Sequence, residues 1–168
     1  MLKNLIITGF MLSGKSSVGK LLSEKIKWNF IDLDKLIEDE EKLSISEIFK
    51  LKGEKYFRNI EYLKLRNFLH LKKNIISLGG GTFCSYRNIN VIKKVGISIL
   101  LKSDIDEILE RASINQIIKR PLFNNNLKTL FNKRQKFYNK ADIKIITKNK
   151  TIENICDEII YKINNLYK

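Results

Sequence analysis

A glycine-rich segment near the start of the chain has the residue types and spacing of a phosphate-binding loop. Residues 9–16 read Gly-Phe-Met-Leu-Ser-Gly-Lys-Ser and match the pattern G-x-x-x-x-G-K-[ST]. The segment follows an apolar run and opens a stretch of helical periodicity, where backbone N–H groups converge on an anion. In this pattern Lys15 contacts the β- and γ-phosphates and Ser16 binds Mg²⁺. We therefore predict an ATP site within residues 9–17, with contacts from Gly9, Met11, Leu12, Ser13, Gly14, Lys15, Ser16 and Ser17.

Two carboxylates follow the second apolar run of the chain. Asp32 and Asp34 flank Leu33 at the end of a predicted strand, where alternation would place both on one side. Strand carboxyl ends in open α/β sheets face the ligand crevice, so these acids could serve a metal and a substrate hydroxyl. A helix cap is the plainer alternative for such a pair. The phosphate-binding loop on a neighbouring strand favours the ligand site.

Two further segments could contact an acceptor molecule. Arg58 precedes Glu61 by one helical turn, a spacing that also suits an ordinary surface ion pair. Gly79, Gly80 and Gly81 follow the third predicted strand and would let the backbone approach a ligand closely. A flexible turn is the alternative there, but three of only eight glycines in one place favour a binding site.

The elements that must hold these residues alternate between apolar β-rich runs and helical periodicity, which is typical of βα units around a parallel sheet. Strands are predicted at 5–8, 29–33, 75–78, 97–101 and 143–147. Helices are predicted at 15–26, 33–41, 45–52, 56–70, 87–95, 105–112, 127–141 and 152–166, the third of them beginning at a capping box, Ser44 to Glu47. Continuous apolar runs fit strands covered on both faces, so we expect an α/β protein with three layers, α/β/α.

One stretch, residues 113–126, breaks this rhythm. It contains the only proline, a run of asparagines and little periodicity. A loop of this length in a compact domain is often a mobile lid, and a disordered insertion is the alternative.

The composition of the chain excludes several classes of protein but does not indicate a function by itself. The 168 residues fit one domain, 1–168, and the apolar run at the N-terminus is too short for a membrane span. A net charge of +14 would suit nucleic-acid binding, but the charges are scattered, and a genome rich in A and T also favours lysine codons. Cys84 and Cys156 indicate neither a disulfide framework nor a metal site. We expect a cytoplasmic protein that binds no membrane and no nucleic acid.

In this order, the segments resemble those of the shikimate kinase family over nearly the whole chain. The quoted matches are GFMLSGKSS from residue 9, DLD at 32–34, IFKLKGEKYFRNIE at 48–61, GGG at 79–81, LKSDIDEILER ending at Arg111, KRPLF at 119–123 and KRQKFY at 133–138. The resemblance implies transfer of the γ-phosphoryl group of ATP to the 3-hydroxyl of shikimate, on the route to chorismate and the aromatic amino acids. It also implies a P-loop kinase fold of five parallel strands in the order 2-3-1-4-5, one Mg²⁺ per subunit and a monomer.

The resemblance further assigns roles at the acceptor site. Asp34 would hold the accepting hydroxyl and act as base. Arg58 and Arg134 would clamp the carboxylate of shikimate, for which a planar guanidinium is well shaped. The loop of Gly79, Gly80 and Gly81 would contact the ring, and the substrate-binding region would span about 33–61.

At the nucleotide, the same resemblance places Asp32 in contact with Mg²⁺ through water and stacks Arg111 on adenine. Arg120, in the lid, would close over the transferring phosphoryl group as a catalytic residue beside Lys15 and Asp34. Another small-molecule kinase of this fold, acting on gluconate or a nucleoside monophosphate, and a non-catalytic basic binding protein are the alternatives.

Leu12 departs from the family, which usually has glycine at this position. A phosphate-binding loop alternates right- and left-handed backbone conformations, and a left-handed leucine costs about 1–2 kcal/mol. We predict a positive φ at Leu12, with its side chain turned away from the phosphates.

Overall fold

The computed structural model of the protein describes residues 3–111 and 127–166, with residues 110 and 111 as backbone only. The predicted lid at 113–126, including Arg120, lies outside the described residues, as does the side chain of Arg111.

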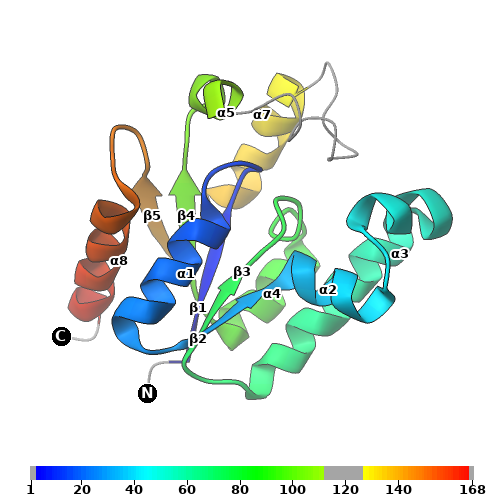
Figure 1. Ribbon diagram of the computed structural model, residues 1–168, viewed down its shortest axis with the longest axis horizontal. Helices are drawn as coiled ribbons and strands as arrows, with labels where there is room; N and C mark the ends of the chain where they lie inside the picture. Colours follow the sequence, from blue (N-terminus) through cyan, green and yellow to red (C-terminus); the bar gives the residue numbers. More distant parts are fainter. Residues whose placement is uncertain (1–2, 112–126, 167–168) are drawn as a thin grey trace.

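One parallel sheet organises the described part of the chain (Figure 1). Its strands are β1 (Asn4–Gly9), β2 (Asn29–Asp32), β3 (Asn74–Ser77), β4 (Gly96–Lys102) and β5 (Ile143–Ile146). Their order is β2-β3-β1-β4-β5, and every adjacent pair is parallel. This order confirms the one implied by the family resemblance.

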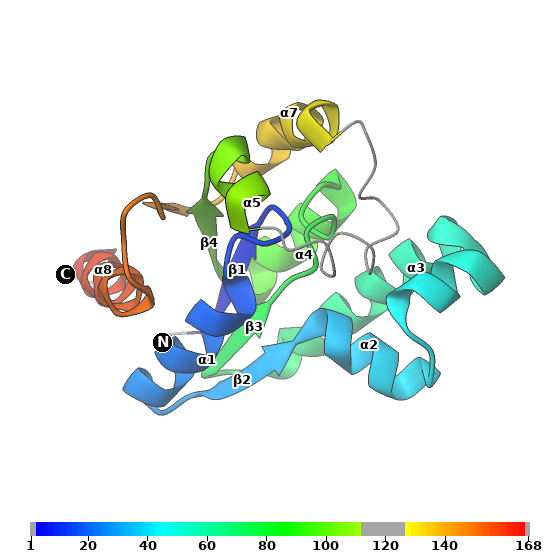
Figure 2. The ribbon, with the colours of Figure 1, turned by 45° about the horizontal axis from the view of Figure 1, so that its top comes forward.

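Helices cover both faces of this sheet (Figures 1 and 2). They are α1 (Lys15–Ile26), α2 (Leu33–Glu41), α3 (Ile45–Asn67), α4 (Tyr86–Val95), α5 (Ile105–Arg111), α7 (Leu127–Tyr138) and α8 (Ile152–Leu166). The two faces are read from the alternating side chains of β1. Leu5 and Ile7 pack in one apolar cluster with α1 and α8, whereas Ile6 packs in a second with α2, α3, α4 and α7. The predicted three layers are therefore confirmed.

Strand β2 ends one residue earlier than predicted, whereas α2 spans the predicted residues 33–41. Asp32 ends β2 and is the N-cap of α2, because its Oδ1 accepts hydrogen bonds from the backbone N–H groups of Asp34 at 3.1 Å and Lys35 at 3.3 Å. Such a cap stabilises a helix by about 1 kcal/mol, enough to start α2 at Leu33. Asp34 therefore lies in the first turn of a helix, and the prediction that strand alternation aligns it with Asp32 is wrong.

The predicted helices at 45–52 and 56–70 are joined in α3, which is kinked at Gly53. There the backbone has φ 82° and ψ 163°, a non-helical conformation within the helix. The predicted capping box at its start is confirmed, with Glu47 N–H donating to Ser44 Oγ and Ser44 N–H donating to Glu47 Oε2. A short 3₁₀ turn, Phe68–His70, follows α3 and ends the second predicted helix three residues early as an α-helix.

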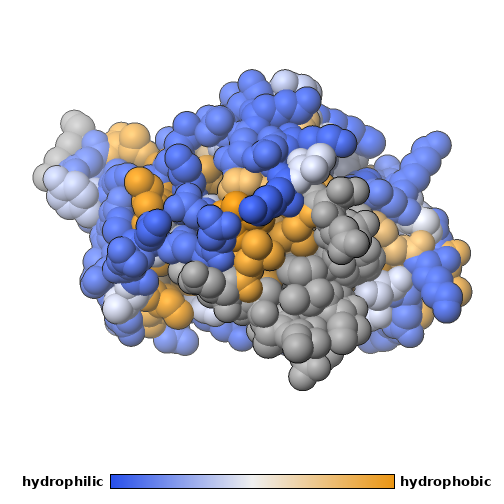
Figure 3. All heavy atoms as spheres, turned by 90° about the horizontal axis from the view of Figure 1, so that it is seen from above, coloured by the Kyte–Doolittle hydropathy of each residue, from blue (hydrophilic) through white to orange (hydrophobic). Residues whose placement is uncertain are grey.

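Parallel strands end at one edge of the sheet, the upper edge in Figure 1. The phosphate-binding loop leaves β1 there, Asp32 ends β2, and the three glycines follow β3 closely. Figure 3 looks onto this end of the molecule, where hydrophilic side chains predominate among the described residues. Within the described ranges, every helix is too short or too polar to span a bilayer.

Candidate active site

The loop between β1 and α1 has the backbone of an anion-binding site. Leu12 has φ 62° and Gly14 has φ 85°, so left-handed residues alternate along the loop, as a convergent set of N–H groups requires. The predicted positive φ of Leu12 is confirmed, and its side chain packs against the apolar cluster that contains Ile6. Gly14 caps α1 without a side-chain hydrogen bond, and the first turn holds no acidic residue, which leaves this positive helix end to a ligand.

Lys15 begins α1 and bends back over the loop. Its ammonium group donates to the carbonyl oxygen of Phe10 at 2.8 Å, and the residue is only 9% exposed. A buried lysine held against the loop carries its charge to the place where the loop N–H groups converge. This position agrees with the predicted contact to phosphates.

A pair of oxygen donors stands beside this loop. Ser16 Oγ donates to Asp32 Oδ2 at 2.6 Å, so the first turn of α1 is tied to the end of β2. The other carboxylate oxygen of Asp32 is engaged in capping α2. Hydroxyl and carboxylate oxygens are the donors that Mg²⁺ takes from proteins, usually few in number and completed by water and phosphate. Ser16 and Asp32 therefore fit the predicted ion.

Each of the three glycines after β3 lies against a different predicted acceptor residue. A Cβ atom on Gly79 would collide with Oδ1 of Asp34. On Gly80 it would lie 3.5 Å from Nη1 of Arg134, and on Gly81 it would lie 2.8 Å from Nη2 of Arg58. The backbone of this loop therefore lies close to three predicted site residues, and its approach to a ligand stays a prediction. Glycine lets three functional side chains converge on one short loop.

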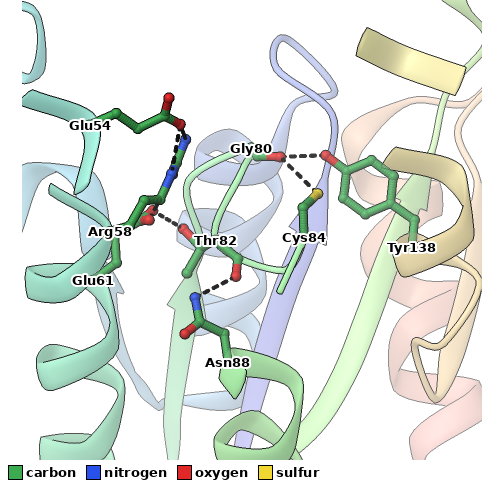
Figure 4. A network of polar contacts seen from close by, with 8 residues as sticks. All are labelled: Glu54, Arg58, Glu61, Gly80, Thr82, Cys84, Asn88 and Tyr138. Atoms are coloured by element: carbon green, nitrogen blue, oxygen red, sulfur yellow. Dashed lines mark hydrogen bonds and ion pairs between the residues drawn. The ribbon is translucent and has the colours of Figure 1, made fainter. Parts of the chain in front are cut away.

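Arg58 is held in place by two carboxylates of α3 (Figure 4). Its Nη1 donates to Glu61 at 2.7 Å, and its Nη2 donates to Glu54 at 3.0 Å. Burial lowers the pKa of this guanidinium, but the two carboxylates outweigh burial and raise it. Arg58 therefore stays charged inside the cleft.

Glu61 is fully buried, so the surface ion pair considered from the sequence is wrong. Its second oxygen accepts a hydrogen bond from the hydroxyl of Thr82, in the turn that follows the glycines. A buried carboxylate must be paired, and here Arg58 and Thr82 supply its partners. The spacing of Arg58 and Glu61 correctly predicted contact but carried no information on depth.

Arg134 of α7 approaches from the other side of the glycine loop. It is 6% exposed, its Cζ lies 5.4 Å from the centre of the Phe10 ring, and its Nη1 has no hydrogen-bond partner among the described residues. A buried guanidinium N–H without a partner is costly unless a ligand uses it. The unsatisfied donor of Arg134 therefore indicates a binding site for a negatively charged ligand.

Tyr138 and Cys84 were missed by the sequence reasoning. The Tyr138 hydroxyl donates to the carbonyl oxygen of Gly80 at 2.5 Å, and the Cys84 thiol approaches the same oxygen at 3.9 Å (Figure 4). Burial raises the pKa of both groups, so both remain protonated donors. Tyr138 lies one helical turn after Arg134, and that spacing was the available signal.

A cleft of about 1020 Å³ opens between α3, α4 and the glycine loop. Among its lining residues are Arg58, Gly81 and Arg134, and it is large enough for a small-molecule substrate. Among the described residues that line the cleft, one is acidic, Glu54, and the other charged residues are basic: Lys52, Lys55, Arg58, Arg87 and Arg134. Such a lining attracts an anionic molecule.

Comparisons with known proteins give this geometry a context. The sequence profile of the shikimate kinase family matches residues 11–164. A curated shikimate kinase of Persephonella marina is 41% identical over 165 residues, which cover 96% of this chain and 99% of that protein. The crystal structure of shikimate kinase from Aquifex aeolicus has a TM-score of 0.85 at 35% identity, covering 98% of both chains. A shikimate kinase from Acinetobacter baumannii in complex with shikimate has a TM-score of 0.91 at 28% identity, covering 98% of this chain and 94% of the other.

Proposed function

We propose that this chain, which belongs to the shikimate kinase family, holds shikimate between its glycine loop, Arg58 and Arg134 while it transfers the γ-phosphoryl group of ATP to it. One observation supports these roles above the others. Gly79, Gly80 and Gly81 each pack against one of three groups, the Asp34 carboxylate and the two guanidinium groups, and Gly80 also lies beside the backbone N–H of Met11. The acceptor residues thereby meet the phosphate-binding loop at a single point.

The carboxylate of shikimate fits the two guanidinium groups. Arg134 offers a buried donor with no partner among the described residues, and Arg58 offers a charge whose position is fixed by buried Glu61. Exposed Glu54 is the partner of Arg58 that a substrate carboxylate can displace at least cost. Charge-assisted, bidentate contacts of this kind fix both the position and the orientation of the ring.

Asp34 is placed to hold the accepting hydroxyl. Its carboxylate packs against Gly79, and its backbone is fixed in the first turn of α2 by the Asp32 cap. A carboxylate there accepts the hydroxyl proton as the oxygen attacks phosphorus. Phosphoryl transfer needs alignment and charge neutralisation above all, and a fixed acceptor provides the first of these.

At the nucleotide, the loop from Gly9 to Ser17 binds the phosphates through backbone N–H groups, and Lys15 exchanges the Phe10 carbonyl for phosphate oxygens. Ser16 would hold Mg²⁺ directly and Asp32 would hold it through water. When bound, the ion neutralises charge on the β- and γ-phosphates. Arg111 at adenine and Arg120 over the phosphoryl group remain predictions, as does closure of residues 113–126. We also propose a cytoplasmic monomer, with residues 1–168 as one kinase domain, about 33–61 as its substrate-binding region, and no nucleic-acid partner.

An acceptor panel tests this function against the kinases of the same fold. Shikimate, gluconate and a nucleoside monophosphate are each incubated with the protein, Mg²⁺ and ATP, and the products are identified by phosphorus NMR. We expect a new phosphomonoester with shikimate alone. A phosphorylated product from either of the other acceptors, with none from shikimate, would overturn the proposal.

A further inference from the structure

A single residue of the phosphate-binding loop touches both halves of the site. The carbonyl oxygen of Phe10 accepts hydrogen bonds from Lys15 Nζ at 2.8 Å and from the backbone N–H of Ser13 at 3.3 Å. Its ring lies 5.4 Å from Cζ of Arg134 and packs edge-on against Phe131, with ring centres 5.2 Å apart. Phe10 thus has its backbone at the nucleotide and its side chain at the acceptor.

This connection lies in a densely packed place. Phe10 is 2% exposed, Arg134 is 6% exposed and Lys15 is 9% exposed. Side chains in such interiors interdigitate with few voids, so a displacement of one is felt by the next. Nη1 of Arg134 has no hydrogen-bond partner among the described residues, and hence contacts with the Phe10 ring and with Gly80 bear on where this guanidinium lies.

We propose that Phe10 is a positioning residue that couples nucleotide binding to acceptor binding. The inference rests on the proposed roles of Lys15 and Arg134. When phosphate oxygens take the Lys15 ammonium, the Phe10 carbonyl loses its charge-assisted hydrogen bond, and its peptide group settles on the Ser13 N–H. The ring moves with that peptide group and sets the face on which Arg134 rests.

The same contacts act in the other direction. A carboxylate that holds Arg134 also fixes the guanidinium against the Phe10 ring, a cation–π contact that strengthens when water is excluded. The ring then holds the loop in the form that binds phosphates. Coupling between two sites is reciprocal by thermodynamic necessity, so each ligand should tighten the binding of the other by one common factor.

Calorimetric titration measures this factor. A non-hydrolysable ATP analogue with Mg²⁺ is titrated into the protein with and without saturating shikimate, and shikimate is titrated with and without the analogue. For the unaltered chain we expect a coupling of about 5-fold or more, the lower end of typical allosteric coupling. In Phe10→Leu the coupling should fall below about 2-fold, while the affinity for the analogue alone stays within about 3-fold.

Two further variants make the test decisive. Phe137→Leu is the control. It removes an aromatic ring of α7 that packs on Tyr86, with ring centres 5.3 Å apart, and it should leave the coupling unchanged. Phe10→Met replaces the ring with a flexible, unbranched side chain that fills irregular gaps in a core, so it is the second variant if Phe10→Leu does not fold, and it should also lose coupling.

The outcomes separate this inference from the proposed function. Coupling that is absent from the unaltered chain, or unchanged in Phe10→Leu or Phe10→Met, overturns the role of Phe10 but leaves the acceptor site as proposed. If Arg134→Ala binds shikimate as tightly as the unaltered chain, the proposed acceptor site itself is wrong.

Discussion

Arg58 and Arg134 are both arginines that face one loop, but the structure prepares them differently. Arg58 is paired with Glu61 and Glu54, whereas Nη1 of Arg134 has no hydrogen-bond partner among the described residues. In the proposed complex, a substrate carboxylate would displace an existing contact at Arg58 and would satisfy a buried donor at Arg134. The two residues would then hold the same group for different energetic reasons.

Removal of either arginine should weaken shikimate binding. Hydrogen bonds to charged groups contribute about 1.5–3 kcal/mol, so Arg58→Ala and Arg134→Ala should each lower shikimate affinity roughly 10- to 150-fold, with ATP affinity little changed. Calorimetry with each ligand measures both values. Arg87→Ala is the matched control, because Arg87 lines the cleft but stacks on the Tyr62 ring, 3.4 Å from its centre. If Arg58→Ala or Arg134→Ala lost ATP affinity alone, the proposed role of that arginine at the acceptor would be wrong.

Leu12 carries strain that a pair of substitutions can isolate. Its φ of 62° is left-handed, a conformation that costs a leucine about 1–2 kcal/mol, so the strain lies in the folded backbone of the loop. Leu12→Ala and Leu12→Gly remove similar packing, but only glycine accepts a left-handed backbone freely. We expect Leu12→Gly to be more stable than Leu12→Ala by about 0.5–1 kcal/mol after the greater flexibility of unfolded glycine is subtracted. Chemical denaturation measures the difference.

Nucleotide affinity provides the second readout at Leu12. Leu12→Gly should bind ATP as tightly as the unaltered chain or more tightly, because its loop adopts the same backbone with less strain. A loss of ATP affinity, or an alanine variant that is the more stable of the two, would count against this account of the loop.

Among the elements, strands were easier to predict from the sequence than the contacts between them. Continuous apolar runs located all five strands of the described sheet, and Ser44 with Glu47 marked the start of α3. The start of α2 at Leu33 was predicted correctly, but the role of Asp32 was not, because a carboxylate there can end a strand or cap a helix, and only the hydrogen bonds of Asp34 and Lys35 decide between the two. Residue propensities along the sequence do not distinguish these two roles of Asp32.

Depth and long-range contact were also beyond the sequence. Glu61 and Arg58 were recognised as neighbours, but burial of Glu61 depends on Thr82, which lies 21 residues further along the chain. The bond from Tyr138 to Gly80 joins residues 58 positions apart. Such contacts follow from the order of the strands, which came from the family resemblance rather than from periodicity.

The kink in α3 gives a prediction for this helix. Gly53, at φ 82° and ψ 163°, occupies a backbone region that is almost restricted to glycine, and a Cβ added there would meet nothing within 4 Å. Gly53→Ala should therefore lower the free energy of unfolding by about 1–2 kcal/mol through backbone strain alone. Lys50→Ala, at an exposed position one turn earlier in α3, is the control and should change stability little. A Gly53→Ala protein as stable as the unaltered chain would mean that α3 straightens without cost.

For the molecule as a whole, the net charge of +14 is consistent with a cationic acceptor cleft but does not require a nucleic-acid partner. Binding that arises only from charge weakens steeply as salt concentration rises. The specific arrangement lies elsewhere, at the carboxyl edge of the sheet, where segments after β1, β2 and β3 bring the phosphate-binding loop, two acids and the glycine loop together.

Coupled ADP release, measured with and without shikimate in the presence of Mg²⁺ and ATP, tests this arrangement most directly. Because the acceptor residues and the phosphate-binding loop meet around Gly80, we predict that ADP release depends on shikimate and that Lys15→Ala abolishes it. Equal ADP release without shikimate, or release that requires a nucleotide acceptor instead, would contradict the account.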